Sequence, residues 1–247
     1  MERKIVRIYK PIRILITCSL LAAIIGILMG FFVRAVHQKQ LNHALIDSIK
    51  ASDAPAALAA LQSGANPNSY LYSKNDDDDT HGKTALVLVI EGTEQSSSNQ
   101  NQTLKVNTHQ EPVELVKALL DKGANPNLKD DGRLATPLFY AAEAGFESCV
   151  RLLLQRGADV NGHDIMGYTP LVLAASKNHP STLRILLDNG ANVNMKTVAD
   201  ETPLEYVNQL PNTLPEIKTI LRKAGGKTNK ELEDTSHQTS GSIAGKQ

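Results

Sequence analysis

The chain has 247 residues, and its 26 basic and 26 acidic side chains give a formal net charge of zero. Nucleic-acid binding usually needs a basic face that neutralises phosphates, so this balance argues against that class. Two cysteines, Cys18 and Cys149, are too few for a disulfide framework, and 4% aromatic residues without Trp favour thin helical layers over a β-sandwich or barrel.

An uncharged apolar stretch near the N-terminus predicts a membrane anchor. Residues 14–33 contain no charged side chain, and about 20 such residues suffice for a helix to cross a bilayer. A short basic segment, 1–13, precedes this transmembrane helix, and a linker, 34–43, follows it. More basic residues precede the stretch than follow it, so the positive-inside rule places the N-terminus in the cytoplasm. The rest of the chain is then extracytoplasmic, and a bacterial inner membrane facing the periplasm is the expected setting.

Other interpretations of this segment remain open. Gly26 and Gly30 have the small-xxx-small spacing that lets two membrane helices approach closely, so they predict a possible homodimer. A cleavable signal peptide is a second hypothesis, although its apolar region is usually shorter, about 7–15 residues. A lipid attached at Cys18 is disfavoured, because most of the apolar run lies beyond that residue.

Beyond this segment the sequence repeats itself. A Gly-Ala-Asn/Asp-x-Asn phrase begins at Gly64, Gly123, Gly157 and Gly190. The last three glycines are 34 and 33 positions apart, and the first gap of 59 corresponds to one repeat plus an insertion. A Thr-Pro-Leu phrase keeps the same step, at 136–138, 169–171 and 202–204, with a Thr-Ala-Leu variant at 84–86. Two phrases that recur in step predict an array of structural repeats.

Each unit predicts two short helices. Thr before Pro starts the first helix, since Pro fits the first helical position and Thr can accept from the free amides. The second helix is more apolar, and Gly157 is expected to end one of them in the left-handed conformation that glycine adopts easily. One such pair cannot bury its apolar face alone, so the units should fold as a stack.

These units resemble ankyrin repeats, most closely over 132–164 and nearly as closely over 166–200. The resemblance implies an all-α, ankyrin-type helical repeat solenoid at 44–229, of about five units including caps, preceded by the single transmembrane helix. The unit at 44–68 lacks Thr-Pro-Leu and would be the N-terminal cap. The last unit, which begins at Glu201, would be the C-terminal cap.

The chain departs from the family pattern in three places. The family's His after Thr-Pro-Leu is replaced by Val87, Phe139, Val172 and Glu205, which predicts less cross-linked turns. Insertions occupy 69–83 and 92–110, and the polar second insertion is expected to be a mobile loop. The polar tail at 230–247 is expected to be disordered.

No pattern supports catalysis. No nucleophile elbow and no His or Cys pair at metal-ligand spacing occurs, so we expect no enzyme, no cofactor and no metal site. Residues 82–84, Gly-Lys-Thr, echo the end of a phosphate loop but lack its first Gly. The acidic run Asp76–Asp79 is a hypothetical calcium loop, but its spacing fits a solvated loop better.

The resemblance also implies where a partner protein binds, namely the turn tips and the exposed face of each first helix, which together form a concave surface. The helix-face candidates are Leu88, Tyr140, Leu173 and Tyr206. The tip candidates are Lys129, Asp130, Arg133, His163, Asp164, Met166, Tyr168, Lys196 and Asp200, and the enlarged first tip adds Tyr70 and Tyr72. Tyr is enriched at interface hot spots, and the alternative interpretation is that some of these rings only cover the helix layer.

The sequence therefore predicts a membrane-anchored ankyrin-repeat protein that binds an unidentified protein. Neutralising an effector or protecting an envelope enzyme are roles that family analogy suggests. The alternative hypothesis is a structural spacer or self-associating scaffold in a membrane assembly.

Overall fold

The computed structural model describes the backbone at residues 2–71, 82–92 and 112–234, and the side chains over these ranges from residue 24 onward, except at position 71. Tyr72, the acidic run at 76–79, almost all of the second insertion and the tail beyond 234 lie outside the described residues. The calcium loop at 76–79, the mobile loop of the second insertion and the disordered tail beyond 234 therefore stay predictions.

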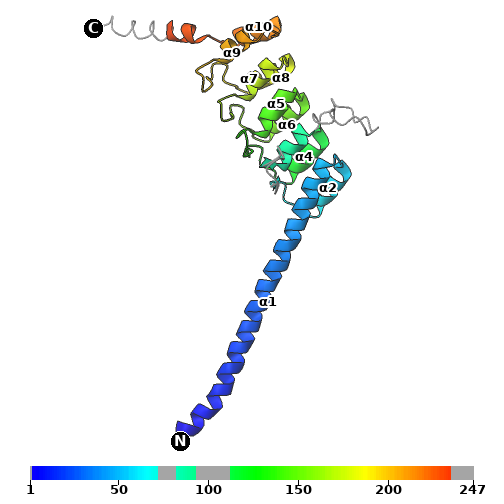
Figure 1. Cartoon of the computed structure of the whole chain (residues 1–247), viewed down its shortest axis with the longest axis vertical. Coiled ribbons are helices and arrows are strands. Elements are labelled where there is room, and N and C mark those ends of the chain that lie inside the picture. The colour runs from blue at the N-terminus through cyan, green and yellow to red at the C-terminus, as the bar shows by residue number, and fades with distance from the viewer. Residues whose placement is uncertain (1, 72–81, 93–111, 235–247) are drawn as a thin grey trace, which may run out of the picture.

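One long helix, α1 (Glu2–Lys50), projects from a curved stack of short helices (Figure 1). Its last turns belong to the stack, because Leu45, Ile46 and Ile49 are buried. The predicted linker at 34–43 is wrong as a separate segment, since the helix runs through it without a break. No Gly or Pro occurs between 34 and 50, so nothing in the sequence interrupts the helix.

The predicted membrane segment is only partly within the described side chains, because residues 14–23 lie outside them. Within the residues that the structure describes, no helix has the length and apolarity needed to cross a membrane. From position 24 to 33 the large apolar side chains of α1 are exposed.

In the described ranges α1 is followed by nine short helices of seven to nine residues each, and then by the helical turn at 229–234. The nine are α2 (Ala54–Gln62), α3 (Ala85–Glu91), α4 (Val113–Asp121), α5 (Pro137–Ala144), α6 (Glu147–Gln155), α7 (Pro170–Ser176), α8 (Pro180–Asp188), α9 (Pro203–Gln209) and α10 (Pro215–Lys223). Together with α1 they pack as consecutive pairs, which gives the mostly helical repeat stack that the sequence predicts.

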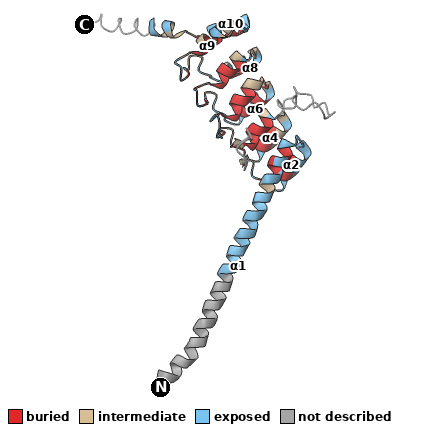
Figure 2. Ribbon diagram, viewed as in Figure 1, coloured by how far each residue is buried: buried red, intermediate tan, exposed pale blue. Residues whose placement is uncertain are grey.

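The pairs form two layers. In the inner layer α1, α3, α5, α7 and α9 pack in succession, and in the outer layer α2, α4, α6, α8 and α10 do the same. Helices α3, α5 and α7 are almost wholly buried, as the red segments in Figure 2 show, because each has an inner helix on both sides and an outer helix behind it. Fully burying a Leu such as Leu138 or Leu171 contributes about 1.5–3 kcal/mol, so stacking supplies the stability that a single pair lacks.

The expected helix starts are confirmed. Helices α5, α7 and α9 begin at the proline of Thr-Pro-Leu, and the preceding Thr has extended backbone. Thr169 and Thr202 accept a hydrogen bond from the backbone of the third helical residue, whereas the Thr136 hydroxyl is buried without a partner. Gly157 has a φ of 83°, as expected for the glycine that ends α6.

A small sheet departs from the all-α expectation. The ends of the first insertion form two strands, β1 (Tyr70–Leu71) and β2 (Lys83–Thr84), which pair antiparallel with Tyr70 opposite Thr84. The corresponding loops of later units are closed by a single backbone bond, for example from Asp164 N to Tyr168 O at 3.1 Å, and form no strands. The longer first loop therefore permits one more step of pairing.

The start of the tail is ordered. Residues 229–234 are helical, so the disorder expected from residue 230 is wrong as far as 234. Thr228 and Glu231 cap this helix reciprocally: Thr228 N donates to Glu231 Oε2 at 2.7 Å, and Glu231 N donates to Thr228 Oγ1 at 3.4 Å. The Thr-x-x-Glu pattern of a capping box was present in the sequence.

Candidate protein-binding surface

The loops between successive helix pairs, here called fingers, project to one side of the stack. The second to fourth fingers lie at 128–136, 162–169 and 195–202, and the first contains β1 and β2. Each finger is tied to the next by one backbone bond: Asp131 N to Gly82 O at 3.1 Å, Ile165 N to Arg133 O at 2.9 Å and Val198 N to Met166 O at 3.0 Å. The finger tips therefore form a continuous edge.

A ladder of asparagines fixes the bases of the fingers. Asn127 donates from Nδ2 to Gly157 O at 2.9 Å and accepts at Oδ1 from Asp159 N at 2.7 Å, both in the next unit. Asn68 makes the same two bonds to the second unit. Only an amide side chain donates and accepts in this way, which explains why the last position of the repeated phrase is always Asn.

Two acidic residues predicted at the finger tips are buried instead. Asp130 and Asp164 are 1% and 3% exposed, because each folds back to hold its own finger. Asp164 Oδ1 accepts from the backbone N–H groups of Met166 and Tyr168, both at 2.9 Å. Asp130 accepts from Arg133 N at 2.7 Å and from the Tyr140 hydroxyl. These carboxylates shape the surface and are not available to a partner at the tips.

Three of the four predicted helix-face residues are also buried. Leu88, Tyr140 and Leu173 lie in the core, and only Tyr206 is partly exposed. Burial and the Asp130 carboxylate raise the pKa of Tyr140 above its ordinary range, so its hydroxyl stays a hydrogen-bond donor. The inner helices are so short, and so closely flanked, that the position two residues after Leu faces a neighbour.

In α3, α5 and α7 the partly exposed positions lie at the C-terminal end, and in α9 the exposed Gln209 lies there as well. Glu91, Glu143, Ser176 and Gln209 each follow the Thr of their unit by seven positions, and all four are polar. This recurrence was present in the sequence, but which helix face it marked depended on the packing.

A charged cluster on this concave side centres on Arg133. Its guanidinium lies 3.4 Å from Glu143 and 3.7 Å from Asp164, and 4.6 Å above the ring of Phe139. Lys177 also pairs with Glu143 at 3.4 Å. The Arg133 side chain remains 46% exposed, and partly exposed pairs of this kind are worth about 0–1 kcal/mol. They can therefore exchange partners with an incoming charged group.

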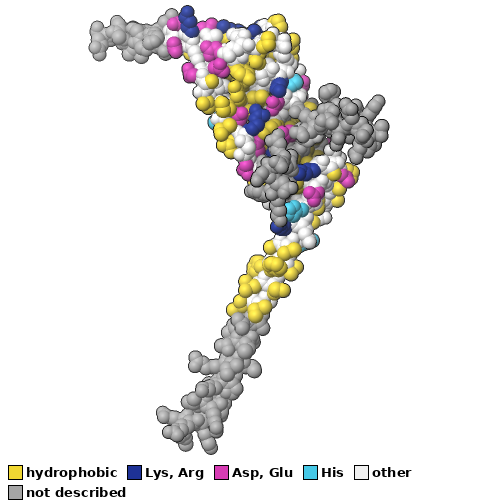
Figure 3. All heavy atoms as spheres, viewed as in Figure 1, with side chains coloured by type: hydrophobic (Ala, Val, Ile, Leu, Met, Phe, Trp, Pro, Cys, Tyr) yellow, Lys and Arg dark blue, Asp and Glu magenta, His cyan; other side chains and the backbone are white. Residues whose placement is uncertain are grey.

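The finger tips carry a row of exposed apolar side chains. Leu134, Ile165, Met166 and Val198 are 42%, 62%, 51% and 71% exposed and come from three successive fingers. Figure 3 shows hydrophobic side chains among charged ones along the stack. Of these four residues, only Met166 was predicted from the sequence to contact a partner. The available signal was an apolar residue inside a turn otherwise made of Gly, Asp and charged residues.

The remaining predicted tip residues make contacts between neighbouring fingers or within one finger. Lys129 Nζ donates to His163 O at 3.0 Å, and the Tyr70 hydroxyl donates to Lys129 O at 3.4 Å. Lys196 pairs with Asp200 at 3.0 Å within the last finger. The rings of Tyr168 and Tyr206 lie 5.1 Å apart, and burial with Tyr206 raises the pKa of Tyr168. The predicted tip residues along this edge are thus Tyr70, Lys129, His163, Tyr168, Lys196 and Asp200. Tyr72 is outside the described residues.

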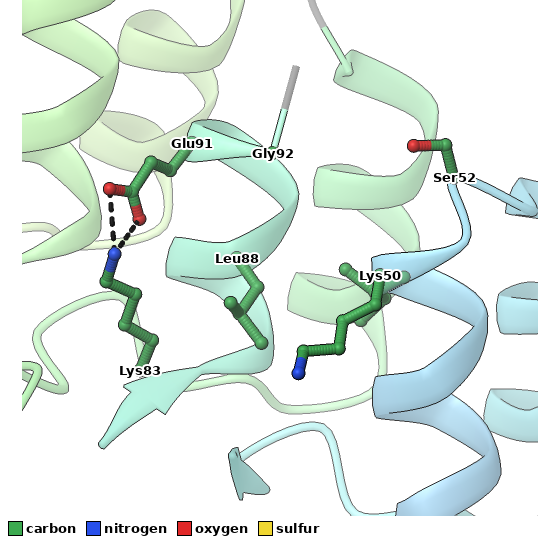
Figure 4. Close-up of a pocket in the computed structure, with 7 residues that line it drawn as sticks. Lys50, Ser52, Lys83, Leu88, Glu91 and Gly92 are labelled. Carbon is green, nitrogen blue, oxygen red and sulfur yellow. Dashed lines mark hydrogen bonds and ion pairs between the residues drawn. The ribbon is translucent and has the colours of Figure 1, made fainter. Parts of the chain in front are cut away.

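A pocket lies between the end of α1 and α3 (Figure 4). Its wall includes Ile49, Leu88 and Ser52, and the Lys83–Glu91 ion pair, at 2.7 Å, crosses one side. Among the described residues no group of three or more His, Cys, Asp or Glu side chains is placed to hold a metal ion. The pocket adjoins the concave surface, and the described residues of its wall contain no such metal-binding group.

Comparison with known proteins identifies the repeats. Residues 105–197 match the family model described as ankyrin repeats (3 copies), so ankyrin repeats are confirmed in this chain. Over 97 residues, 39% of the chain, it is 38% identical to the ARF GTPase-activating protein Git of Drosophila melanogaster, of which the match covers 12%. Over 92 residues, 37% of the chain, it is 32% identical to Dauer abnormal formation protein 25 of Caenorhabditis elegans, of which the match covers 24%. The matches thus span less than a quarter of either relative.

Proposed function

We propose that this chain is a membrane-tethered adaptor that binds a partner protein through the finger edge and the adjoining concave surface of its ankyrin repeats. Ankyrin repeats imply protein–protein interaction. The observation that carries the proposed site is the row Leu134, Ile165, Met166 and Val198, because apolar side chains exposed side by side on a braced edge are suited to burial against another protein.

The charged cluster beside this row supports the same site. Arg133, Glu143 and Lys177 lie on the concave side, where a partner that covers the finger edge also reaches them. An apolar centre flanked by polar groups is the usual anatomy of an interface, and Arg is among the residues enriched there.

The test is capture of partners by the full-length chain from its own solubilised membranes, beside a Met166→Asp/Val198→Asp variant. A Leu214→Asp variant is the matched control, because Leu214 is 44% exposed but lies between α9 and α10, away from the fingers. We expect one stoichiometric partner with the wild type and the control, and its loss with the finger variant, at equal melting temperatures. Recovery by all three chains would remove the finger edge from the site.

The tether is supported by the exposed part of α1. Successive helical residues point about 100° apart, so Ile27, Leu28, Met29, Phe31 and Val33 spread exposed apolar groups around most of the helix, and Gly26 and Gly30 lie on the remaining side. A helix that is apolar all round belongs in a core or a membrane, and the structure places no other described element against this stretch. The uncharged residues 14–23 extend it.

We place the N-terminus in the cytoplasm and the repeats outside it, facing a bacterial periplasm, from the charges that flank the segment. Alkaline extraction tests the tether: the wild type should stay in the membrane pellet, and a Leu28→Arg/Phe31→Arg variant should be released. A C-terminal fusion to a phosphatase that is active only outside the cytoplasm tests the orientation, which an inactive but expressed fusion would reverse.

A self-associating scaffold is the second candidate. Gly26 and Gly30 stand one helical turn apart, and a Cβ built at either meets no atom within 4 Å. This open small-residue face favours close approach of a second α1. If Gly26→Leu/Gly30→Leu abolishes cross-linked dimers in membranes, the scaffold role gains support. Effector neutralisation and enzyme protection are roles that the identity of the captured partner decides.

A further inference from the structure

We infer that α1 joins the membrane segment to the repeats as one stiff strut, so that the stack stands at a fixed height above the bilayer and fits a partner attached to the same membrane. This inference rests on the proposed tether. The same helix, α1, carries the exposed apolar stretch and forms the first inner helix of the stack.

Helix α1 enters the asparagine ladder as if it were a repeat unit. Gln38 Nε2 donates to Gly64 O at 3.0 Å, and Asn66 N donates to Asn42 Oδ1 at 2.8 Å. Asn68 makes this same pair of bonds to the next unit with its single amide. Gln38 and Asn42, which are also bonded to each other at 3.0 Å, therefore replace one ladder residue with two residues one turn apart.

Apolar burial locks the same end of the helix. Leu45, Ile46 and Ile49 belong to the core, Leu41 is packed against it, and α1 contacts both α2 and α3. Each fully buried aliphatic side chain contributes about 1.5–3 kcal/mol, so α1 cannot swing away from the stack without exposing several of them.

The helix between the apolar segment and the stack is short. From Val33 to Leu41 it rises about 12 Å, at 1.5 Å per residue, and contains no Gly or Pro. The headgroup layer is about 5–8 Å thick on each side, so the stack begins just outside it. Arg34 and Lys39 are exposed on this stretch, and no acidic residue occurs between Val33 and Asp47, which suits anionic headgroups.

This geometry selects a kind of partner. A flexible linker lets a domain search a volume, whereas a helical strut presents the finger edge only within a layer about 40–50 Å deep, given five helix pairs spaced by 8–10 Å. A partner held in the same membrane has already lost much of its translational and rotational freedom before it binds the finger edge. Its effective concentration at that edge is therefore higher. A partner free in solution gains nothing from the fixed height.

Electron–electron distance measurements on the full-length chain in lipid nanodiscs test the strut. Spin labels are placed at Leu28→Cys and at Lys117→Cys, an exposed position of α4, in a Cys18→Ser/Cys149→Ala background. The comparison is a chain with Gly-Ser-Gly-Ser inserted between Val36 and His37, which keeps Gln38 and Asn42 in the cap and should leave the melting temperature of the stack unchanged.

We expect one narrow distance distribution for the original chain and a distribution broadened by about 10 Å for the insertion variant, since four flexible residues span about that distance. Equal widths in the two chains would overturn the strut while leaving the tether intact. Failure of the chain to enter nanodiscs would overturn the tether and, with it, the strut.

The kind of partner is tested by cross-linking in intact membranes. The protein captured by the original chain should resist alkaline extraction, and the insertion variant should recover several-fold less of it. A captured protein that is released by alkali, or that is recovered equally by both chains, overturns attachment of the partner to the same membrane.

Discussion

At its N-terminal end the stack is closed by the last turns of α1, whereas at its C-terminal end the closing elements beyond α10 are polar. The N-terminal closure buries Leu45, Ile46 and Ile49 and adds two amide side chains to the ladder. At the other end Lys227 N donates to Asn194 Oδ1 at 2.8 Å, and Asn229 N donates to Glu205 Oε1 at 2.8 Å.

The comparison shows that the asparagine ladder can be ended by any groups with the right donors and acceptors, but that only at the N-terminal end do these groups belong to a helix that also buries apolar side chains. Polar closures exchange one set of hydrogen bonds for bonds to water, so each contributes little net free energy. We therefore expect the C-terminal end to open first and the N-terminal end to unfold only with the whole stack.

The largest expected effect is at the N-terminal end. Leu45→Ala removes a side chain with no exposed surface and should lower the free energy of unfolding by about 2–5 kcal/mol. Leu232→Ala in the partly exposed helix at 229–234 is the matched change at the other end and should cost less than about 1 kcal/mol. Urea unfolding followed by circular dichroism measures both, and equal losses would contradict the proposed difference between the ends.

The next effect is within the ladder. Asn127→Ala leaves Gly157 O and Asp159 N without their partner and should lower the free energy of unfolding by about 1–3 kcal/mol. Asn42→Ala should cost less, about 1 kcal/mol, because Gln38 still bonds to Gly64 O. If Asn127→Asp, which keeps the acceptor, were as stable as the original chain, the donor half of the ladder would be irrelevant.

Helix caps give a smaller effect. Thr202 Oγ1 accepts from Glu205 N, and Glu205 Oε2 accepts from Thr202 N in return. Thr202→Val should therefore lower the free energy of unfolding by about 0.5–2 kcal/mol. It should also speed amide hydrogen exchange beyond residue 225, because Glu205 holds Asn229 N. Thr136→Val is the control, because the Thr136 hydroxyl has no hydrogen-bond partner, and it should be nearly neutral or stabilising. A larger loss for Thr136→Val than for Thr202→Val would show that the caps do not act as described.

The smallest effect is a local pH dependence at the C-terminal end. Hydrogen bonds from Arg222 and Thr228 lower the pKa of Glu231 from its ordinary value of 4.5 to about 2. The ionised carboxylate favours the folded helix, so this contribution is present above pH 4.5 and is lost as the pH falls towards 2. The protection factors of the amides at 229–234, which compare their exchange with that of an unfolded peptide at the same pH, should fall over that window in the original chain and stay constant in Glu231→Gln.

Several features of the fold were predictable from local patterns. The Thr-Pro-Leu phrases located the starts of α5, α7 and α9, and the glycine of each Gly-Ala-Asn/Asp phrase located a left-handed turn. The expectation of less cross-linked turns was wrong at Glu205, whose carboxylate caps α9 and also accepts from Asn229 in the following segment. That second bond joins residues 24 positions apart, which no local pattern reveals.

The candidate site was less predictable than the fold. The spacing to Leu88, Tyr140 and Leu173 is a property of one helix, but their burial is decided by the neighbouring units on either side. Asp130 and Asp164 read as surface charges in sequence, yet each turns inward because the backbone N–H groups of its finger need an acceptor. Of the exposed row, Leu134, Ile165 and Val198 were not predicted from the sequence, because the members of the row lie in different units.

The sequence by itself determined the repeat, its length, the starts of α5, α7 and α9 and the apolar character of the N-terminal segment, because these depend on residues near one another in the chain. Only the tertiary structure decided that α1 runs without a break into the stack, that its amides begin the ladder, and which side chains of each finger point outward. Those features arise from contacts between units, where burial and hydrogen bonding depend on what the neighbouring unit supplies.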